Sequence, residues 1–191
     1  MNTQLLWFTA RSSGIVAWAL VSASVLWGLA LSTRVLGPRP RANWLIDLHR
    51  FLGGASVVFV GVHVLATVLD SYVHFGLVEV LVPLASSWRP LPVALGIVSA
   101  YLLVAIQVTS LLRRRLPRRL WHAVHLASFP LFVVSTVHLL TTGTDAANPA
   151  LRIAAMGVTA TVALLMLFRG DHDPKQARNV PATSERVPSA A

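Results

Sequence analysis

Long apolar stretches alternate with short polar segments along most of the chain. Five such stretches occur, at residues 13–33, 48–69, 93–112, 120–140 and 151–168. An α-helix needs about 20 apolar residues to cross the hydrocarbon core of a bilayer, and the shortest stretch still fits the lower end of that range. The pattern therefore predicts an all-α, polytopic transmembrane helical bundle with five spans.

The polar connections divide the chain further. Segments 37–43 and 113–119 combine proline with arginine, and 142–149 is a short polar loop. The longest connection, 70–91, contains the run FGLVEVLVPL, for which we expect a short interfacial helix or re-entrant piece. A sixth span is expected only if this connection hides one. The predicted organisation is a short outer N-terminus (1–12), a transmembrane domain (13–168) and a disordered cytoplasmic tail (169–191).

Composition supports this class of protein and excludes several kinds of chemistry. The chain is 55% hydrophobic and 12% charged, which is too apolar for an ordinary soluble domain. It contains no cysteine, which excludes disulfides, iron–sulfur clusters, thiolate-ligated haem and covalently attached haem within the chain. It also has no glycine fingerprint for a dinucleotide, so we expect no flavin or NAD(P)H site.

The formal charge of +9 is distributed unevenly between the connections. Of the 16 Lys and Arg residues, 13 lie in or beside the first connection, the third connection and the tail. The exceptions are Arg11, Arg89 and Arg152. This alternation predicts an N-terminus outside and a C-terminus in the cytoplasm, in a multi-pass protein of a cell membrane, typically a bacterial inner or plasma membrane. It favours a lipid bilayer over nucleic acid as the partner, while a basic patch for an acidic partner is the less favoured alternative.

Four of the seven histidines lie within, or at the margin of, two predicted spans. His49 and His63 belong to the second span, and His125 and His138 to the fourth. Ionisable groups inside a membrane are costly, so they usually face the bundle interior and mark function. Both spans run in the same direction, and at about 1.5 Å rise per residue the second histidine of each lies about 20 Å beyond the first. We therefore expect an inner pair, His49 with His125, and an outer pair, His63 with His138.

Each pair could hold one planar cofactor between neighbouring helices. Haem iron accepts imidazole as an axial ligand, and two imidazoles leave no vacant position, which suits electron transfer. The 14-residue step in the second span returns to the same helix face, where Gly53 and Ser56 would leave room. The 13-residue step in the fourth span does not, unless a kink at Pro130 restores the phase. Phe132 would lie between two cofactors or simply pack in the core.

The remaining candidates carry weaker signals. We expect His122 to make an interfacial contact, and His74 and His172 to be solvated. Arg50 and the arginines at 113–119 lie near the inner pair, where they would either orient the protein or pair with haem propionates. Arg50 is therefore included among the candidate cofactor-binding residues.

The motifs LHRFLGG…VH (48–63) and RRLWHAVH…VH (118–138) resemble the ferric reductase-like transmembrane domain. This superfamily includes ferric reductases, the membrane part of NADPH oxidases and the haem-binding membrane subunit of a periplasmic methionine sulfoxide reductase system. The resemblance covers roughly residues 10–170. It implies two b-type haems, with His49, His63, His125 and His138 as axial ligands, and electron transfer from inside to outside.

The chain departs from the family's usual pattern in two ways. The family core usually has six helices where five are predicted here, and the flavin and nicotinamide domain of the oxidases is absent. The resemblance thus implies an oxidoreductase component supplied with electrons by a separate flavin reductase or by membrane quinol, and an extracytoplasmic redox partner is open as the acceptor. The intact set of four histidines argues mildly against the sulfoxide reductase branch, which tends to carry a basic residue where His49 stands.

Two other classes of function stay open. A transporter whose histidines relay protons would usually also need carboxylates inside the membrane, and none of the seven acidic residues lies mid-span. A structural or assembly subunit would bind no cofactor. Both would be colourless, whereas a haem protein absorbs visible light.

Overall fold

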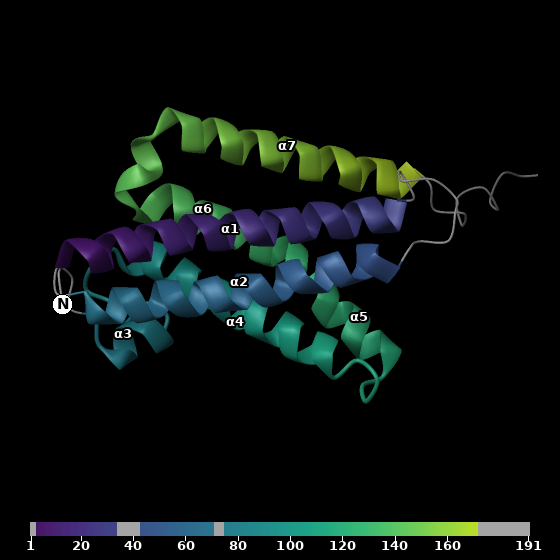
Figure 1. The fold of residues 1–191 in the computed structure, drawn as a ribbon, viewed down its shortest axis with the longest axis horizontal. Helices are drawn as coiled ribbons and strands as arrows, with labels where there is room; N and C mark the ends of the chain where they lie inside the picture. Colours follow the sequence, from purple (N-terminus) through teal and green to yellow (C-terminus); the bar gives the residue numbers. More distant parts are fainter. Residues whose placement is uncertain (1–2, 34–42, 71–74, 172–191) are drawn as a thin grey trace, which may run out of the picture.

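The computed structural model describes residues 3–33, 43–70 and 75–171, and its regular structure there is helical throughout (Figure 1). The elements are α1 (Thr3–Thr33), α2 (Asn43–Leu69), α3 (Leu77–Leu81), α4 (Pro90–Leu111), α5 (Arg118–Leu126), α6 (Ser128–Thr142), the 3₁₀ turn η1 (Thr144–Ala147) and α7 (Pro149–Asp171). Most of the first connection, His74, His172 and the tail beyond residue 171 lie outside the described residues.

The prediction of an all-α bundle with five spans is confirmed. Five segments are long and apolar enough to cross a membrane, namely Gln4–Thr33, Asn43–Leu69, Pro90–Leu111, Arg118–Thr142 and Pro149–Phe168. The 70–91 connection contains α3, which has only five residues and is far too short for a further span. The chain is therefore a multi-pass membrane protein.

Prolines mark where several helices begin. Pro90 and Pro149 are the first residues of α4 and α7, and Pro117 directly precedes α5. Proline suits these positions because the first N–H groups of a helix have no intrahelical partner and its fixed φ is already helical. The same residues that interrupt the apolar stretches in the sequence thus define the starts of the spans.

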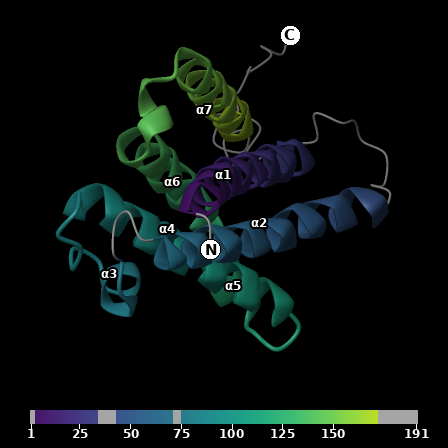
Figure 2. The same ribbon diagram turned by 60° about the vertical axis from the view of Figure 1, so that its left-hand side comes forward.

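The spans run back and forth along the long axis of the molecule (Figure 1). The end of α1, the beginning of α2 and the turn between α4 and α5 gather at one end, and α3 and η1 lie at the other (Figures 1 and 2). The exposed arginines at 113–115, 118 and 119 lie at the first end. This arrangement agrees with the charge alternation in the sequence, and the side of the membrane on which each end lies stays a prediction.

Helix α1 is the central element of the bundle. It packs against α2, α6 and α7, while α4 packs mainly against α6 (Figures 1 and 2). One core cluster joins α1, α6 and α7 and contains Phe132, which is 1% exposed, together with Val25, Leu29 and Val162. Phe132 thus packs in the core, which is one of the two roles expected for it, the other being a place between two cofactors. A second cluster joins α1, α4 and α6 through Val21, Leu103, Ile106 and Leu131.

Large apolar side chains cover the outside of the bundle. They come from every span and include Phe8, Phe51, Leu65, Tyr101, Leu111, Ile153 and Leu167. In water such a surface would be unfavourable, but lipid tails cover it in a bilayer. Hydroxyl groups within the spans, such as Ser56, Ser99 and Thr136, donate back to carbonyls of their own helix, so they are satisfied without water.

Candidate functional site

The structure brings the four intramembrane histidines together as two pairs. The ring centroids of His49 and His125 are 6.0 Å apart, with the ring planes at 71°. Those of His63 and His138 are 6.4 Å apart, with the planes at 80°. All four side chains are partly buried. The spatial pairing expected from the matched depths is therefore present, and the role of these residues as ligands stays a prediction.

The helices that carry the two members of each pair are held apart. Within the described residues, α2 packs against α1 and more lightly against α4, and it has at most marginal backbone contact with α5 or α6. The imidazole rings nevertheless approach each other across this separation at two levels. The bundle thus keeps a space between α2 and α5–α6 that the histidine side chains enter from both sides.

Three of the four rings rest against a glycine on a neighbouring helix. A Cβ atom built on Gly96 would lie 2.6 Å from Cε1 of His138, and one built on Gly14 would lie 2.9 Å from Nδ1 of His63. At Gly28 the corresponding distance, to Cε1 of His49, is 3.2 Å. Carbon contacts below 3 Å are strongly repulsive, so larger residues would displace the outer rings.

Each of these glycines follows, four residues later, the residue that bonds the same histidine. The carbonyl of Ala10 accepts a hydrogen bond from Nδ1 of His63 at 2.7 Å, and Gly14 follows it. The carbonyl of Pro92 accepts from Nδ1 of His138 at 2.8 Å, and Gly96 follows it. Because residues four apart lie on one helix face, a single face both orients the ring and makes room for it.

These bonds fix the tautomer of the outer pair. A carbonyl oxygen can only accept, so in each neutral imidazole Nδ1 carries the hydrogen and Nε2 keeps its lone pair. Nε2 is then the nitrogen able to bind a metal, and a hydrogen bond from the other ring nitrogen is the usual support for a ligating histidine. His138 has a further contact, between its Nδ1 and the hydroxyl of Thr142 at 3.0 Å.

The inner pair is held differently. Nδ1 of His49 lies 3.4 Å from the hydroxyl of Ser24, four residues before Gly28, which repeats the outer arrangement with a long hydrogen bond to a side chain. Nδ1 of His125 is buried and has no hydrogen-bond partner. Its ring instead stacks on Trp121, with centroids 5.2 Å apart and planes at 23°.

The fourth span brings both of its histidines toward α2 because it is broken. Helix α5 ends at Leu126, and the N–H of Ala127 bonds back three residues, to Val124, before α6 begins at Ser128. This tighter turn changes the phase of the helix, which a 13-residue step requires. Pro130 lies in the first turn of α6, where proline costs no hydrogen bond. The break therefore precedes the proline that the sequence singled out.

A cavity of about 360 Å³ is lined by both histidines of the outer pair. Most of its lining is apolar and comes from α1, α2, α4 and α6, including Trp18, Val21 and Leu103. Gly14, Gly96, Arg11, Arg89 and Asp145 also line it. An apolar cavity with a few polar groups is typical of a cofactor site.

Other candidates lie outside these contacts. Arg50 forms an exposed ion pair with Asp47 at 3.0 Å, and its place beside an inner propionate stays a prediction. His122 is exposed next to Trp121. Gly53 faces the side chain of Gln107, and Ser56 is fully buried, so the room beside the rings comes mainly from glycines on α1 and α4.

The ring separations fit a metal ion held between two imidazoles. With metal–nitrogen bonds of about 2 Å on either side, two opposed imidazoles have their centroids about 6 Å apart. Both pairs meet this condition, at 6.0 and 6.4 Å. Two protein ligands are fewer than a structural zinc site uses, but they match the two axial positions of haem iron.

Comparison with known proteins gives one match. The family model of the ferric reductase like transmembrane component matches residues 13–136. This range contains His49, His63 and His125 and ends two residues before His138. Searches of curated proteins and of solved structures each returned no match. Because the family model covers well over half of the sequence, the chain belongs to the family of ferric reductase-like transmembrane components.

Proposed function

We propose that the chain binds two b-type haems, one at each histidine pair, and passes electrons across the membrane. The observation that carries this proposal is the meeting of two imidazole pairs at ring separations of 6.0 and 6.4 Å, between helices whose backbones make at most marginal contact. Membership of the ferric reductase-like family supports a transmembrane electron-transfer role independently of these distances.

The axial ligands would be His49 with His125 and His63 with His138. Haem iron bound by two imidazoles has both axial positions filled and supplies one-electron transfer rather than oxygen binding. In the outer pair, the carbonyls of Ala10 and Pro92 would keep Nε2 of each ring free for the iron. In the inner pair, Trp121 would hold the plane of the His125 ring.

Residues around the pairs would keep each site dry and spaced. Gly14, Gly28 and Gly96 let the rings approach α1 and α4 closely. Apolar side chains such as Val21 and Leu103 line the outer cavity and exclude water, which lowers the local polarity around the cofactor. Along α2, His49 and His63 lie about 21 Å apart, so the two pairs together span much of the hydrocarbon core.

The donor and the acceptor would be separate molecules. We propose that electrons enter at the arginine-rich end, from a flavin reductase or membrane quinol, and leave at the opposite end to an outer acceptor. The exposed arginines at 113–115, 118 and 119 would place the first end in the cytoplasm. The chain would thus act as an oxidoreductase component rather than as a complete enzyme.

The test is a haem count on the purified protein. We expect the visible spectrum of air-oxidised and dithionite-reduced protein to be that of b-type haem, and a pyridine haemochrome assay to give about two haems per chain. His63→Ala and His49→Ala should each remove one haem, and His122→Ala, an exposed histidine on α5, should remove none. A colourless wild-type protein would refute the proposal. So would a His63→Ala or His49→Ala variant that keeps two haems.

A further inference from the structure

Three arginines lie at the end of the bundle opposite to the arginine-rich turn. They are Arg11 on α1, Arg89 just before α4, and Arg152 on α7. Membrane orientation does not call for positive charge at this end, so another role is expected for at least some of them. Two of the three, Arg11 and Arg89, line the cavity of the outer histidine pair, and Arg152 is not among its lining residues.

Both cavity arginines lie next to the residues that orient the outer histidines. Arg11 directly follows Ala10, whose carbonyl bonds His63. Arg89 lies three residues before Pro92, whose carbonyl bonds His138. One arginine therefore accompanies each outer histidine, on a different segment from the histidine itself, and both arginines line the same apolar cavity.

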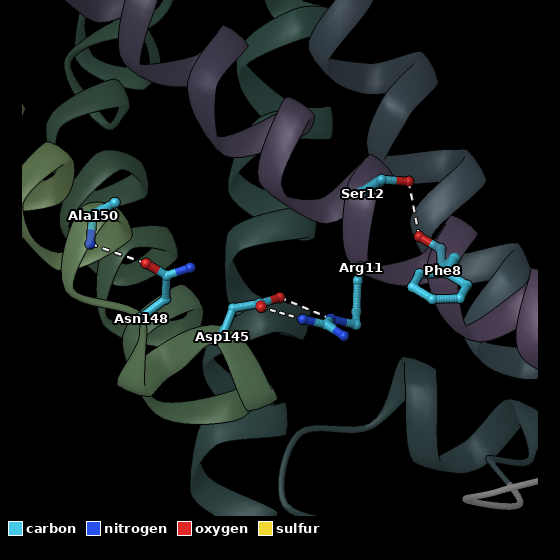
Figure 3. A network of polar contacts seen from close by, with 6 residues as sticks. All are labelled: Phe8, Arg11, Ser12, Asp145, Asn148 and Ala150. Atoms are coloured by element: carbon cyan, nitrogen blue, oxygen red, sulfur yellow. Dashed lines mark hydrogen bonds and ion pairs between the residues drawn. The ribbon is translucent and has the colours of Figure 1, made fainter.

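Arg11 already binds a carboxylate through two nitrogens. Its Nε donates to Oδ2 of Asp145 at 2.8 Å, and its Nη2 contacts Oδ1 of the same residue, as Figure 3 shows. The guanidinium also lies 4.0 Å from the centre of the Trp7 ring. This forked arrangement is the geometry in which arginine recognises carboxylates, and both of its residues line the cavity.

The position of Arg89 is held by an unusual backbone conformation. Its φ of 42° and ψ of 63° lie in the left-handed region, which is unfavourable for a residue other than glycine. Its Nη1 donates to the carbonyl of Thr141 at 2.8 Å, at the end of α6 and close to His138. Strain that persists at one residue is often retained because that side chain is needed where it lies.

We propose that Arg11 and Arg89 form a carboxylate-binding site at the edge of the outer cavity, which takes the two propionate groups of the haem held by His63 and His138. Asp145 competes for Arg11 and occupies its guanidinium until a cofactor carboxylate replaces it. This inference rests on the proposed function, because the two arginines would bind the propionates of the haem whose iron His63 and His138 would bind.

The test compares the release of haem from five variants of the full chain. Transfer of haem to apomyoglobin is followed by absorbance, and the outer phase is identified as the phase that His63→Ala removes. Arg11→Gln and Arg89→Gln should each speed the outer phase about tenfold, since a charge-assisted hydrogen bond is lost, and leave the inner phase unchanged. Arg152→Gln, which loses the same charge at the same end but only a bond to the carbonyl of Ala146, should change neither.

Asp145→Asn separates carboxylate binding from a purely structural ion pair. If Asp145 is a competitor, Asp145→Asn leaves the outer phase unchanged or slows it. If the pair only ties α1 to η1, Asp145→Asn speeds the outer phase as much as Arg11→Gln does, and that result would overturn the inference. An equal effect of Arg152→Gln would also overturn it, because the total positive charge at this end of the bundle would then control the rate of outer haem release.

A chemical variant of the cofactor tests the same proposal in the wild-type protein, where misfolding of a mutant cannot affect the result. Haem dimethyl ester lacks both carboxylates, so wild-type chain prepared without haem should bind it about tenfold more weakly than haem at the outer site, and Arg11→Gln should show a smaller preference. No preference in the wild type would overturn the carboxylate site alone, while the proposed function would stand. A wild-type chain that binds neither compound would overturn both.

Discussion

The outer and inner histidine pairs have nearly the same ring separation but are held by different kinds of group. Main-chain carbonyls of α1 and α4 orient both outer rings, at 2.7 and 2.8 Å. The inner rings depend on side chains, through a 3.4 Å contact with Ser24 and the stacking of Trp121 on His125. The backbone of α1 and α4 therefore orients the outer rings, and individual side chains orient the inner ones.

This difference has a consequence for how the two sites respond to substitution. A carbonyl is present whatever the residue, so the outer hydrogen bonds survive side-chain changes on α1 and α4 as long as the helices keep their places. The outer site is instead sensitive to steric change, because its rings lie against Gly14 and Gly96 with no space to spare. The inner site should be more sensitive to the removal of single side chains.

The largest effect is expected from adding one methyl group at the outer pair. Gly96→Ala would place a carbon 2.6 Å from the His138 ring, which must shift. Overpacking of this kind costs about 1–3 kcal/mol, so we expect haem retention at the outer site to fall roughly tenfold or more. Haem content and the outer release phase measure the effect.

Alanine substitutions at two other glycines test whether the effect follows the distance to the histidine ring. Gly28→Ala, with its contact at 3.2 Å, should weaken the inner site less, and Gly61→Ala, with nothing within 4 Å, should leave both haems in place. Alanine is the better helix former, so Gly61→Ala should if anything stabilise the fold by about 1 kcal/mol. Equal losses from Gly61→Ala and Gly96→Ala would show that backbone flexibility, rather than contact with the ring, is the cause.

A smaller effect is expected at the inner pair from Trp121→Leu. The stacking of two aromatic rings contributes about 0.5–1.5 kcal/mol, so retention of the inner haem should fall about fivefold while the outer release phase stays as in the wild type. Trp121→Phe keeps an aromatic ring and should retain most of the wild-type behaviour. Trp44→Leu, at an exposed tryptophan near the same end, is the matched control. A faster outer phase in Trp121→Leu would contradict the separation of the two sites.

The smallest effect is expected from Ser24→Ala. A 3.4 Å contact lies near the limit of a hydrogen bond, and its loss should cost no more than about 0.5 kcal/mol. We therefore expect less than about a twofold change in release of the inner haem. Titration of the inner haem's redox potential would detect any altered basicity of His49, and a shift confined to the outer haem would contradict the action of Ser24 on the inner pair.

The five spans and the matched depths of the histidines could be predicted from sequence because both follow from periodicity along single helices. The pairing of rings at two levels follows from the same reasoning. The glycines at 14, 28 and 96 were missed because each acts on a histidine of another helix, and nothing in a single helix pattern shows which helix will be its neighbour. Their one visible signal is glycine in the interior of an apolar helix, where it lowers helix propensity and so usually has a packing reason.

The route by which His125 and His138 face α2 could be predicted only in part. The 13-residue step showed that an unbroken helix would not suffice, and proline was the residue expected to break it. The structure places the break at Ala127, because Pro130 is better accommodated in the first turn of a new helix than inside an old one. Such a choice depends on how α5 and α6 pack against α4, which local propensity does not contain.

The separation of α2 from α5 and α6 also bears on how the protein is made. Each span is apolar enough to insert by itself, and α2 packs against α1 while α6 packs against α4 and α1, with at most marginal backbone contact between the helices that carry the two members of a histidine pair. Insertion and helix association are separable stages for membrane bundles. If the protein binds the two proposed haems, we therefore expect synthesis and membrane insertion to yield a colourless bundle in which α1 already links α2 to α6, and maturation to end when a haem enters each histidine pair.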